Sequence, residues 1–149
     1  MTEEIFSTGP VEKPNTALMT FIVNESAALP NWQAPVSCGG SAEGYPRWRY
    51  FDLDAYGQMV FPTITDGVAG RIVGVTSQDQ LTGLSMPCHL MGQGIKLVEA
   101  GGEISCGESV GSDNVGRAVG GHTGGGVALQ AASGAGLIIP VLLIAQALS

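Results

Sequence analysis

Short apolar segments separated by glycine-rich turns dominate the chain from residue 101 to residue 144. Segments of strand length lie at Glu108–Val110, Arg117–Val119, Val127–Leu129 and Leu137–Ile144. None of these segments is long enough for an ordinary helix. The glycines between them permit the positive φ angles that tight chain reversals need. The pattern therefore predicts an all-β fold.

An internal repeat extends this prediction towards the N-terminus. Residues 51–60 align without gaps with residues 110–119, so that Asp54 matches Asp113 and Gly57 matches Gly116. The further matches are Gly74-Val75 with Gly126-Val127, and Gly83-Leu84 and Pro87 with Gly136-Leu137 and Pro140. We expect both prolines at strand edges or bulges, because proline cannot donate to a strand ladder. Two similar β units packing together predict a small barrel or sandwich.

Residues 1–44 differ in character from the rest of the chain. They contain four prolines and few glycines, and Thr16–Val23 is their strand candidate. We interpret residues 1–44 as an extended N-terminal arm that adds a strand to another surface, followed by a β domain over residues 45–149. The alternative is a disordered terminus. Large apolar residues argue against that alternative: Ile5, Phe6, Leu18, Phe21 and Trp32.

An aromatic segment opens the predicted β domain. In Tyr45–Phe51, Trp48 and Tyr50 alternate with arginines, which is the period-two pattern of a strand. We expect an aromatic face that packs inward or at an interface, and an arginine face directed outward. Arginine beside aromatic side chains also suits stacking on nucleic-acid bases. The chain has no other basic cluster, so the strand interpretation is favoured.

Composition and charge narrow the classes of function. A length of 149 residues suits one domain, and 13% charged residues is about half the usual share. The net charge of −7 argues against nucleic-acid binding, which requires clustered lysine and arginine. The apolar run from residue 136 to residue 148 is too short to span a bilayer and contains Pro140. We expect neither a nucleic-acid nor a membrane partner, and a surface partly buried against other proteins.

The candidate catalytic and metal-binding residues form no recognisable set. Cys88, His89, Cys106 and His122 lack the short paired spacing of zinc ligands. The glycine-rich segment 120–126 lacks the lysine of a phosphate-binding loop. Asp52 and Asp54 share one face of a strand, but they fall just before a turn glycine, where aspartate commonly serves turn geometry. We expect no metal, no cofactor and no enzymatic activity, and we expect Cys38, Cys88 and Cys106 to be reduced, mostly buried thiols.

A family resemblance rests on the C-terminal repeat. The segments Ile95–Asp113, Gly116–Val119 and Gly126–Val141 resemble the C-terminal pattern of the structural cement, or capsid decoration, proteins of tailed bacteriophages. The Gly-Glu-x-Val turn at Gly107–Val110 also resembles β-clip folds, such as those of lambda-type head decoration proteins. The resemblance covers about residues 92–144 and includes no catalytic signature.

The resemblance implies a virion protein, made in the host cytoplasm, that binds the outer surface of an icosahedral capsid and clamps neighbouring subunits. Its expected partners are the major capsid protein and further copies of itself in a homotrimer. The residues expected at these interfaces are Ile5, Phe6, Leu18, Phe21, Trp32, Trp48 and Tyr50. One alternative is a virion fibre or receptor-binding module that uses exposed loops such as residues 120–126. The other is a small β-fold enzyme.

Overall fold

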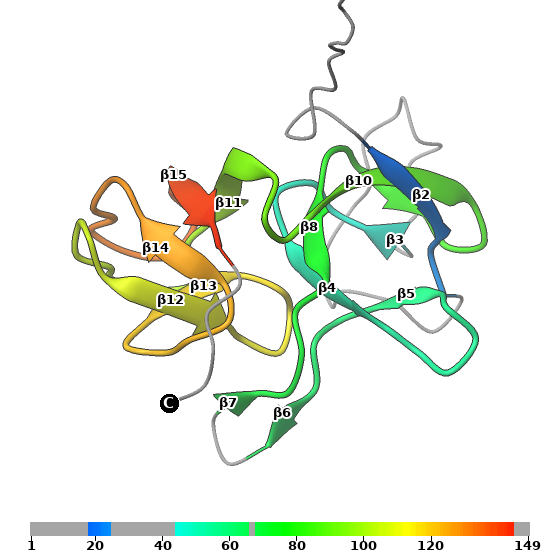
Figure 1. Cartoon of the computed structure of the whole chain (residues 1–149), viewed down its shortest axis with the longest axis horizontal. Helices are drawn as coiled ribbons and strands as arrows, with labels where there is room; N and C mark the ends of the chain where they lie inside the picture. Colours follow the sequence, from blue (N-terminus) through cyan, green and yellow to red (C-terminus); the bar gives the residue numbers. More distant parts are fainter. Residues whose placement is uncertain (1–17, 25–43, 66–67, 145–149) are drawn as a thin grey trace, which may run out of the picture.

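Two β units lie side by side in the computed structural model of the chain (Figure 1). The structure describes residues 18–24, 44–65 and 68–144. Within these ranges every regular element is a strand, which confirms the all-β prediction. No helix in the described residues has the length and apolar character needed to cross a membrane.

The first unit is built on a five-stranded antiparallel sheet with the strand order β2-β10-β8-β4-β5. Its strands are β2 (Met19–Ile22), β4 (Tyr50–Leu53), β5 (Met59–Val60), β8 (Gly74–Thr76) and β10 (Ser85–Leu90). Two short pairs accompany this sheet. They are β3 (Gly44–Tyr45) with β9 (Gln80–Leu81), and β6 (Ile64–Thr65) with β7 (Val68–Ala69).

The second unit repeats this arrangement with the strand order β11-β15-β14-β12-β13. Its strands are β11 (Gly94–Glu99), β12 (Ser109–Ser112), β13 (Ala118–Gly120), β14 (Gly126–Ala128) and β15 (Ile138–Leu143). Each sheet curls until its first strand meets its last. The contact is a parallel bridge between Val23 and Met59 in the first unit, and between Ala100 and Ala118 in the second. Each unit is therefore a small curled half-barrel.

Strand pairing in the two units agrees residue for residue. Phe51 lies opposite Gly74 in the first sheet, and the matched residues Val110 and Gly126 lie opposite each other in the second. The repeat predicted from the sequence is therefore confirmed in the hydrogen-bonding register. Gly74 and Gly126 are glycines because the backbone of the neighbouring strand lies too close for a side chain. A Cβ on Gly74 would lie 2.1 Å from the carbonyl oxygen of His89.

The pairing also reveals a part of the repeat that the sequence alignment missed. Ile22 lies opposite Ser85 on β10, just as Glu99 lies opposite Ile138 on β15. Strand β2 is thus the counterpart of β11, although the residues at their equivalent positions are not identical. Since β2 falls within residues 1–44, that segment contributes an edge strand to the first unit of its own chain. The remainder of the proposed arm, with Ile5, Phe6 and Trp32, lies outside the described residues.

Equivalent aspartates shape the two Asp-x-x-Gly turns. The Oδ1 atom of Asp54 accepts the backbone N–H groups of Tyr56 and Gln58, at 2.8 and 3.0 Å. Asp113 accepts two N–H groups in the same way, at 3.0 and 2.8 Å. The bond from Gln58 and the other donors around Asp54 lower the pKa of its carboxyl group, because they stabilise the charged form. The assignment of Asp54 to turn geometry is therefore confirmed.

The two matched prolines differ from their predicted places. Pro87 and Pro140 lie within β10 and β15, which are inner strands and not sheet edges. The carbonyl oxygen of Pro140 accepts the N–H of Leu129 at 3.0 Å, but proline has no N–H to return a bond. The neighbouring strand β14 ends there, at Ala128. The pairing of β14 with β15 therefore ends next to Pro140, so the N–H group that proline lacks is not needed to continue the ladder.

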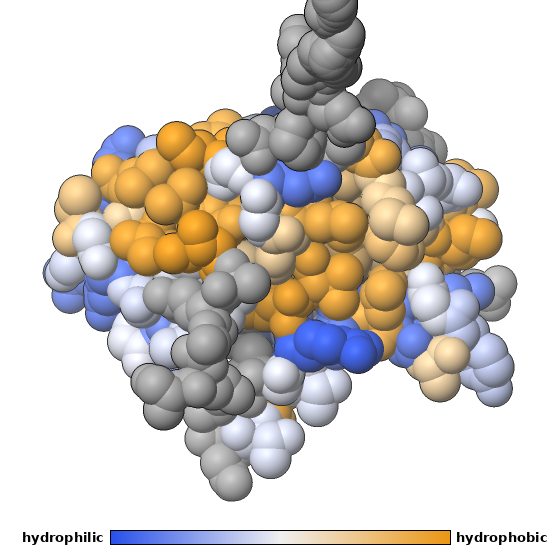
Figure 2. Space-filling model, viewed as in Figure 1, coloured by the Kyte–Doolittle hydropathy of each residue, from blue (hydrophilic) through white to orange (hydrophobic). Residues whose placement is uncertain are grey.

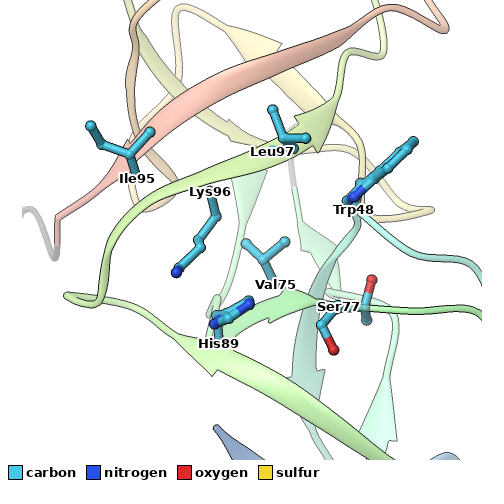
Figure 3. Close-up of a pocket in the computed structure, with 8 residues that line it drawn as sticks. Trp48, Val75, Ser77, His89, Ile95, Lys96 and Leu97 are labelled. Carbon is cyan, nitrogen blue, oxygen red and sulfur yellow. The ribbon is translucent and has the colours of Figure 1, made fainter. Parts of the chain in front are cut away.

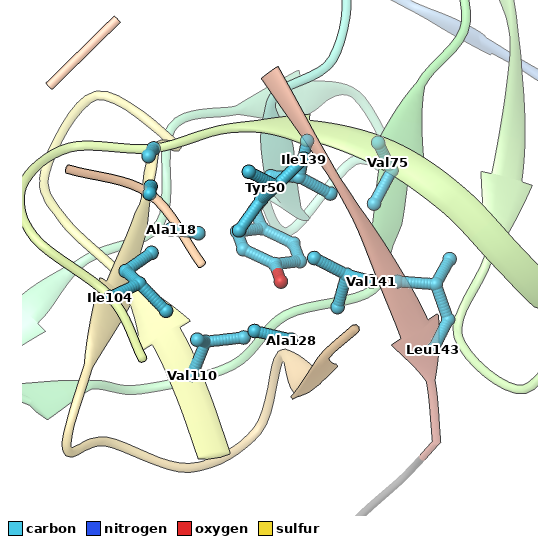
Figure 4. Packing of buried hydrophobic residues seen from close by; sticks show 12 residues of the cluster. Tyr50, Val75, Ile104, Val110, Ala118, Ala128, Ile139, Val141 and Leu143 are labelled. Carbon is cyan, nitrogen blue, oxygen red and sulfur yellow. The ribbon is translucent and has the colours of Figure 1, made fainter. Parts of the chain in front are cut away.

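Two hydrophobic clusters fill the units, and one of them joins the units together. The cluster of the first unit includes Phe51, Met59 and Met86. The cluster of the second unit takes in Tyr50 and Val75 from the first unit (Figure 4). Residues of the first unit therefore complete the core of the second, and the described chain packs as one body.

The tight backbone approaches predict a matched set of glycine variants. Gly74→Ala and Gly126→Ala should each lower the free energy of unfolding by at least about 2 kcal/mol, because the new Cβ would lie 2.1 Å from a backbone oxygen. Gly134→Ala is the control, since nothing lies within 4 Å of the position that its Cβ would take, and its φ is not positive. Urea unfolding followed by circular dichroism measures the difference. Equal stability of the three variants would contradict the register described above.

Candidate binding surface

Exposed apolar side chains gather on the two equivalent edge strands. Met19 and Ile22 on β2, and Ile95 and Leu97 on β11, are all exposed, Ile95 to 56%. Apart from its closing bridge, each of these strands pairs with one neighbour. An edge strand with apolar side chains is a template for a partner segment, because its outer backbone groups accept another strand.

Apolar colour extends over much of one face of the molecule (Figure 2). Further exposed apolar residues are Leu18, Leu84, Leu129, Leu137 and Ile144. A monomeric protein rarely exposes a large contiguous apolar area, and such areas commonly mark interaction sites. The described surface is therefore suited to contact another protein rather than to remain fully solvated.

Arg49 connects the two units beneath this surface. Its guanidinium group lies between them and donates from Nη2 to both carboxylate oxygens of Glu99, at 3.1 Å each. Its Nη1 donates to the carbonyl oxygen of Val115 at 2.9 Å. The side chain is buried, so the expectation of an outward arginine face is wrong at this position. The unit junction explains the burial, because Glu99 and Val115 both belong to the second unit.

The structure separates the residues predicted to form an interface. Leu18 is exposed, whereas Phe21 packs on Phe51 with their ring centroids 5.5 Å apart. Trp48 is half-buried at the unit junction. Tyr50 is fully buried and donates its hydroxyl proton to the carbonyl oxygen of Gly125 at 2.7 Å. Tyr50 therefore serves the interface between the two units of one chain.

Trp48 adopts an unusual backbone conformation. Its φ angle is +64°, and it is the one non-glycine residue with positive φ in the described chain. The N–H of Trp48 donates to Thr76, and its carbonyl oxygen accepts the N–H of Glu99 at 2.8 Å. The guanidinium carbon of Arg47 lies 3.9 Å from the ring centroid, a cation–π contact. These contacts from both units hold a conformation that a tryptophan otherwise avoids.

Several exposed residues were not identified from the sequence. Ile95 and Leu97 belong to a segment whose alternation predicts a strand, but alternation alone does not say which face meets solvent. Tyr56 is 89% exposed at the tip of the first Asp-x-x-Gly turn. Its counterpart, Val115, lies at the unit junction, where its carbonyl oxygen accepts a hydrogen bond from Arg49. Equivalent positions of the repeat thus differ in exposure, and the sequence alignment does not predict this difference.

The cysteines and histidines considered as catalytic or metal-binding residues do not form a common site in the described residues. Cys88 is buried, its Sγ lies 3.6 Å from the Sδ of Met59, and burial raises its pKa to about 12. Cys106 is exposed, contrary to the expectation of a buried thiol, while Cys38 lies outside the described residues. Among the described residues, no group of three or more histidine, cysteine or acidic side chains is placed to hold a metal ion.

The left-handed conformation of Trp48 predicts that glycine at this position is more stable than alanine, the reverse of the usual order in a strand. Trp48→Gly should be more stable than Trp48→Ala by about 1 kcal/mol, because a left-handed residue with a Cβ is strained. Both variants lose the indole, so their difference isolates the backbone effect. Ser85, in strand β10, is the control site, where glycine should be less stable than alanine. Thermal unfolding of the four variants checks the reversal.

Comparison with known proteins identifies a structural likeness. No protein-family model and no curated protein sequence matches the chain. A similar solved structure is the head fibre gp8.5 N base of bacteriophage phi29, with a TM-score of 0.57 and 14% sequence identity. The match covers 89% of this chain and 99% of that chain. The chain therefore shares the all-β architecture of that base over nearly its whole length.

Proposed function

We propose that this chain is a structural protein of a tailed-phage virion that binds the outer surface of an icosahedral capsid. In this role it acts as a homotrimer, stabilises contacts between major capsid subunits and carries out no catalysis. The observation that carries the proposal is the likeness of fold to the N base of a phage head fibre. The resemblance of residues 92–144 to capsid decoration proteins points in the same direction and is independent of that match.

The described surface supports a protein partner. Strand β2 presents exposed apolar side chains and the outer backbone groups of a sheet edge, which suits strand addition by a neighbouring subunit, and β11 adds the exposed Ile95 and Leu97. Three arginines are engaged in ion pairs within the chain: Arg49 with Glu99, Arg71 with Asp52, and Arg117 with Asp113. With a net charge of −7, this arrangement disfavours contact with packaged DNA and suits an outer surface.

The second candidate is the base of a virion fibre or receptor-binding module. The similar solved structure favours it, because that protein is the base of a head fibre. Both candidates require attachment to a capsid, so one binding experiment tests their shared part. They differ in consequence: a cement protein raises the stability of the shell, whereas a fibre base needs only to stay attached.

Capsid binding should depend on strand β2. We expect the purified protein to co-sediment with expanded, protein-stripped heads of its source virus at a fixed ratio to the major capsid protein. Leu18→Lys combined with Ile22→Lys should weaken this binding at least tenfold, since buried apolar side chains contribute about 1.5–3 kcal/mol each. Tyr56→Lys, at an exposed residue of the first Asp-x-x-Gly turn outside both edge strands, is the control and should bind as the parent does.

The contribution of the N-terminal segment needs a separate truncation. Removing residues 1–17 leaves β2 in place, whereas a longer deletion would also remove the buried Val23. We expect the truncated protein to remain folded and to lose capsid binding. Undiminished binding by the truncated protein would show that residues 1–17 do not contribute to capsid binding. Absence of saturable binding by the full chain would overturn the proposal. Bound protein that leaves the melting temperature of the heads unchanged would favour the fibre base.

A further inference from the structure

A cavity of about 250 Å³ lies where the two units meet (Figure 3). Strand β11 of the second unit forms one side, and β8 and β10 of the first unit form the other. Trp48 and Val75 contribute apolar side chains to the wall. Ile95 and Leu97 border the wall with their side chains on the opposite face of β11 from Lys96 (Figure 3). A volume slightly below that of ordinary ligand sites suits a small molecule or a single side chain.

Two nitrogen-bearing side chains face each other across this cavity. Lys96 extends from β11 towards His89 on β10 (Figure 3). The Nδ1 atom of His89 is buried and makes no hydrogen bond to the described residues. A buried polar atom of this kind costs free energy unless a partner is supplied. The hydroxyl groups of the wall do not supply it, because Thr76 and Ser77 donate to the carbonyl oxygens of Pro46 and Pro87.

The twin unit shows that the fold itself does not require these polar residues. Equivalent pairing positions carry apolar residues in the other unit. His89 corresponds to Leu142, Thr76 to Ala128, and Lys96 to Met19. Within the described strands, these polar residues therefore belong to the unit junction that holds the cavity and have no polar counterparts at the equivalent positions.

The strained residue of the chain borders the same cavity. Trp48, with its φ of +64°, lines the wall beside β11. Backbone strain in a non-glycine residue persists only where surrounding contacts enforce it, and it is concentrated at functional sites. The strain, the unsatisfied nitrogen and the unit-specific polar residues are three separate observations at one place.

We propose that the junction cavity binds a carboxylate group attached to a short apolar body, with Lys96 and His89 holding the carboxylate. The apolar body would lie against Trp48 and Val75, on the same side of β11 as Lys96 (Figure 3). The carboxylate comes either from a free small acid or from an acidic side chain of a protein partner. This inference does not rest on capsid binding, and the two are tested separately.

The chemistry of the wall selects a carboxylate over other groups. One ammonium and one imidazole match a singly charged group that accepts two bonds. A phosphate dianion brings more acceptors and more charge than these two donors satisfy. A neutral amide lacks the charge that Lys96 attracts.

Binding should also respond to pH through His89. Burial, and then the charge of Lys96, lower the pKa of His89, so its imidazole is neutral at neutral pH. Lys96 is the other charged residue in the wall; the facing residues of β8 are Val75, Thr76 and Ser77. A bound carboxylate favours the protonated imidazole, which donates from Nδ1. Affinity should therefore rise as the pH falls from about 8 to about 6, a range in which the ligand remains ionised.

Butyrate and its neutral counterpart butyramide are suitable probes. In the full chain with Trp32→Phe, Trp48 is the remaining tryptophan, and its fluorescence reports occupancy of the cavity. We expect saturable binding of butyrate, with butyramide at least tenfold weaker. The tripeptide acetyl-Gly-Glu-Gly-amide and its glutamine counterpart test the protein side-chain source. Competition by the glutamate peptide supports a protein partner, and binding of butyrate without competition supports a free acid.

The twin unit supplies the variants. Lys96→Met should reduce butyrate affinity about tenfold, and Lys96→Arg should retain it. His89→Leu should abolish the pH dependence. Arg71→Gln, which removes a positive charge from an exposed residue outside the cavity wall, is the control and should bind as the parent does. Equal binding of butyrate and butyramide, unchanged affinity in Lys96→Met, or absence of saturable butyrate binding by the folded parent would each overturn the proposal.

Discussion

The buried contact of Arg49 with the second unit is the interaction on which the arrangement of the two units depends. One guanidinium group binds the carboxylate of Glu99 on β11 and the carbonyl oxygen of Val115 in the second Asp-x-x-Gly turn. The adjacent N–H of Tyr50 donates to Gly116 at 2.7 Å. Removing one member of a buried ion pair leaves a charge without compensation, which makes such contacts specific in geometry. The same contact holds β11, which forms one side of the cavity, against the first unit.

The sequence predicted the parts of the fold that depend on glycine and aspartate. Gly74 and Gly126 must lack a Cβ, and Asp54 and Asp113 satisfy turn N–H groups, so these positions retain their identity in both units. The sequence gives no sign that β2 is the counterpart of β11, because edge strands are constrained mainly by backbone pairing. Backbone pairing can be satisfied by different side chains, and the matched residues of β2 and β11 are not identical at any position.

The binding surface was less predictable than the fold for a related reason. Period-two alternation identifies a strand and its two faces, but the direction of each face depends on distant elements. Tyr50 and Arg49 are adjacent in an aromatic and basic segment that resembled a surface strand. Both are buried because the second unit covers them, which involves residues 50 or more positions later. Trp48 likewise takes its conformation from contacts to both units, and no local pattern indicates it.

The twin edge strands also have a consequence for how the chain folds. Because β2 and β11 pair with their sheets in the same register, each strand is a competitor for the place of the other while the chain is incomplete. Phe21 on β2 corresponds to Val98 on β11, and Val98 is fully buried. A phenylalanine in the place of Val98 would overfill the second core, so an exchanged pairing is less stable than the native one. The difference in size between these two side chains thus directs each strand to its own sheet.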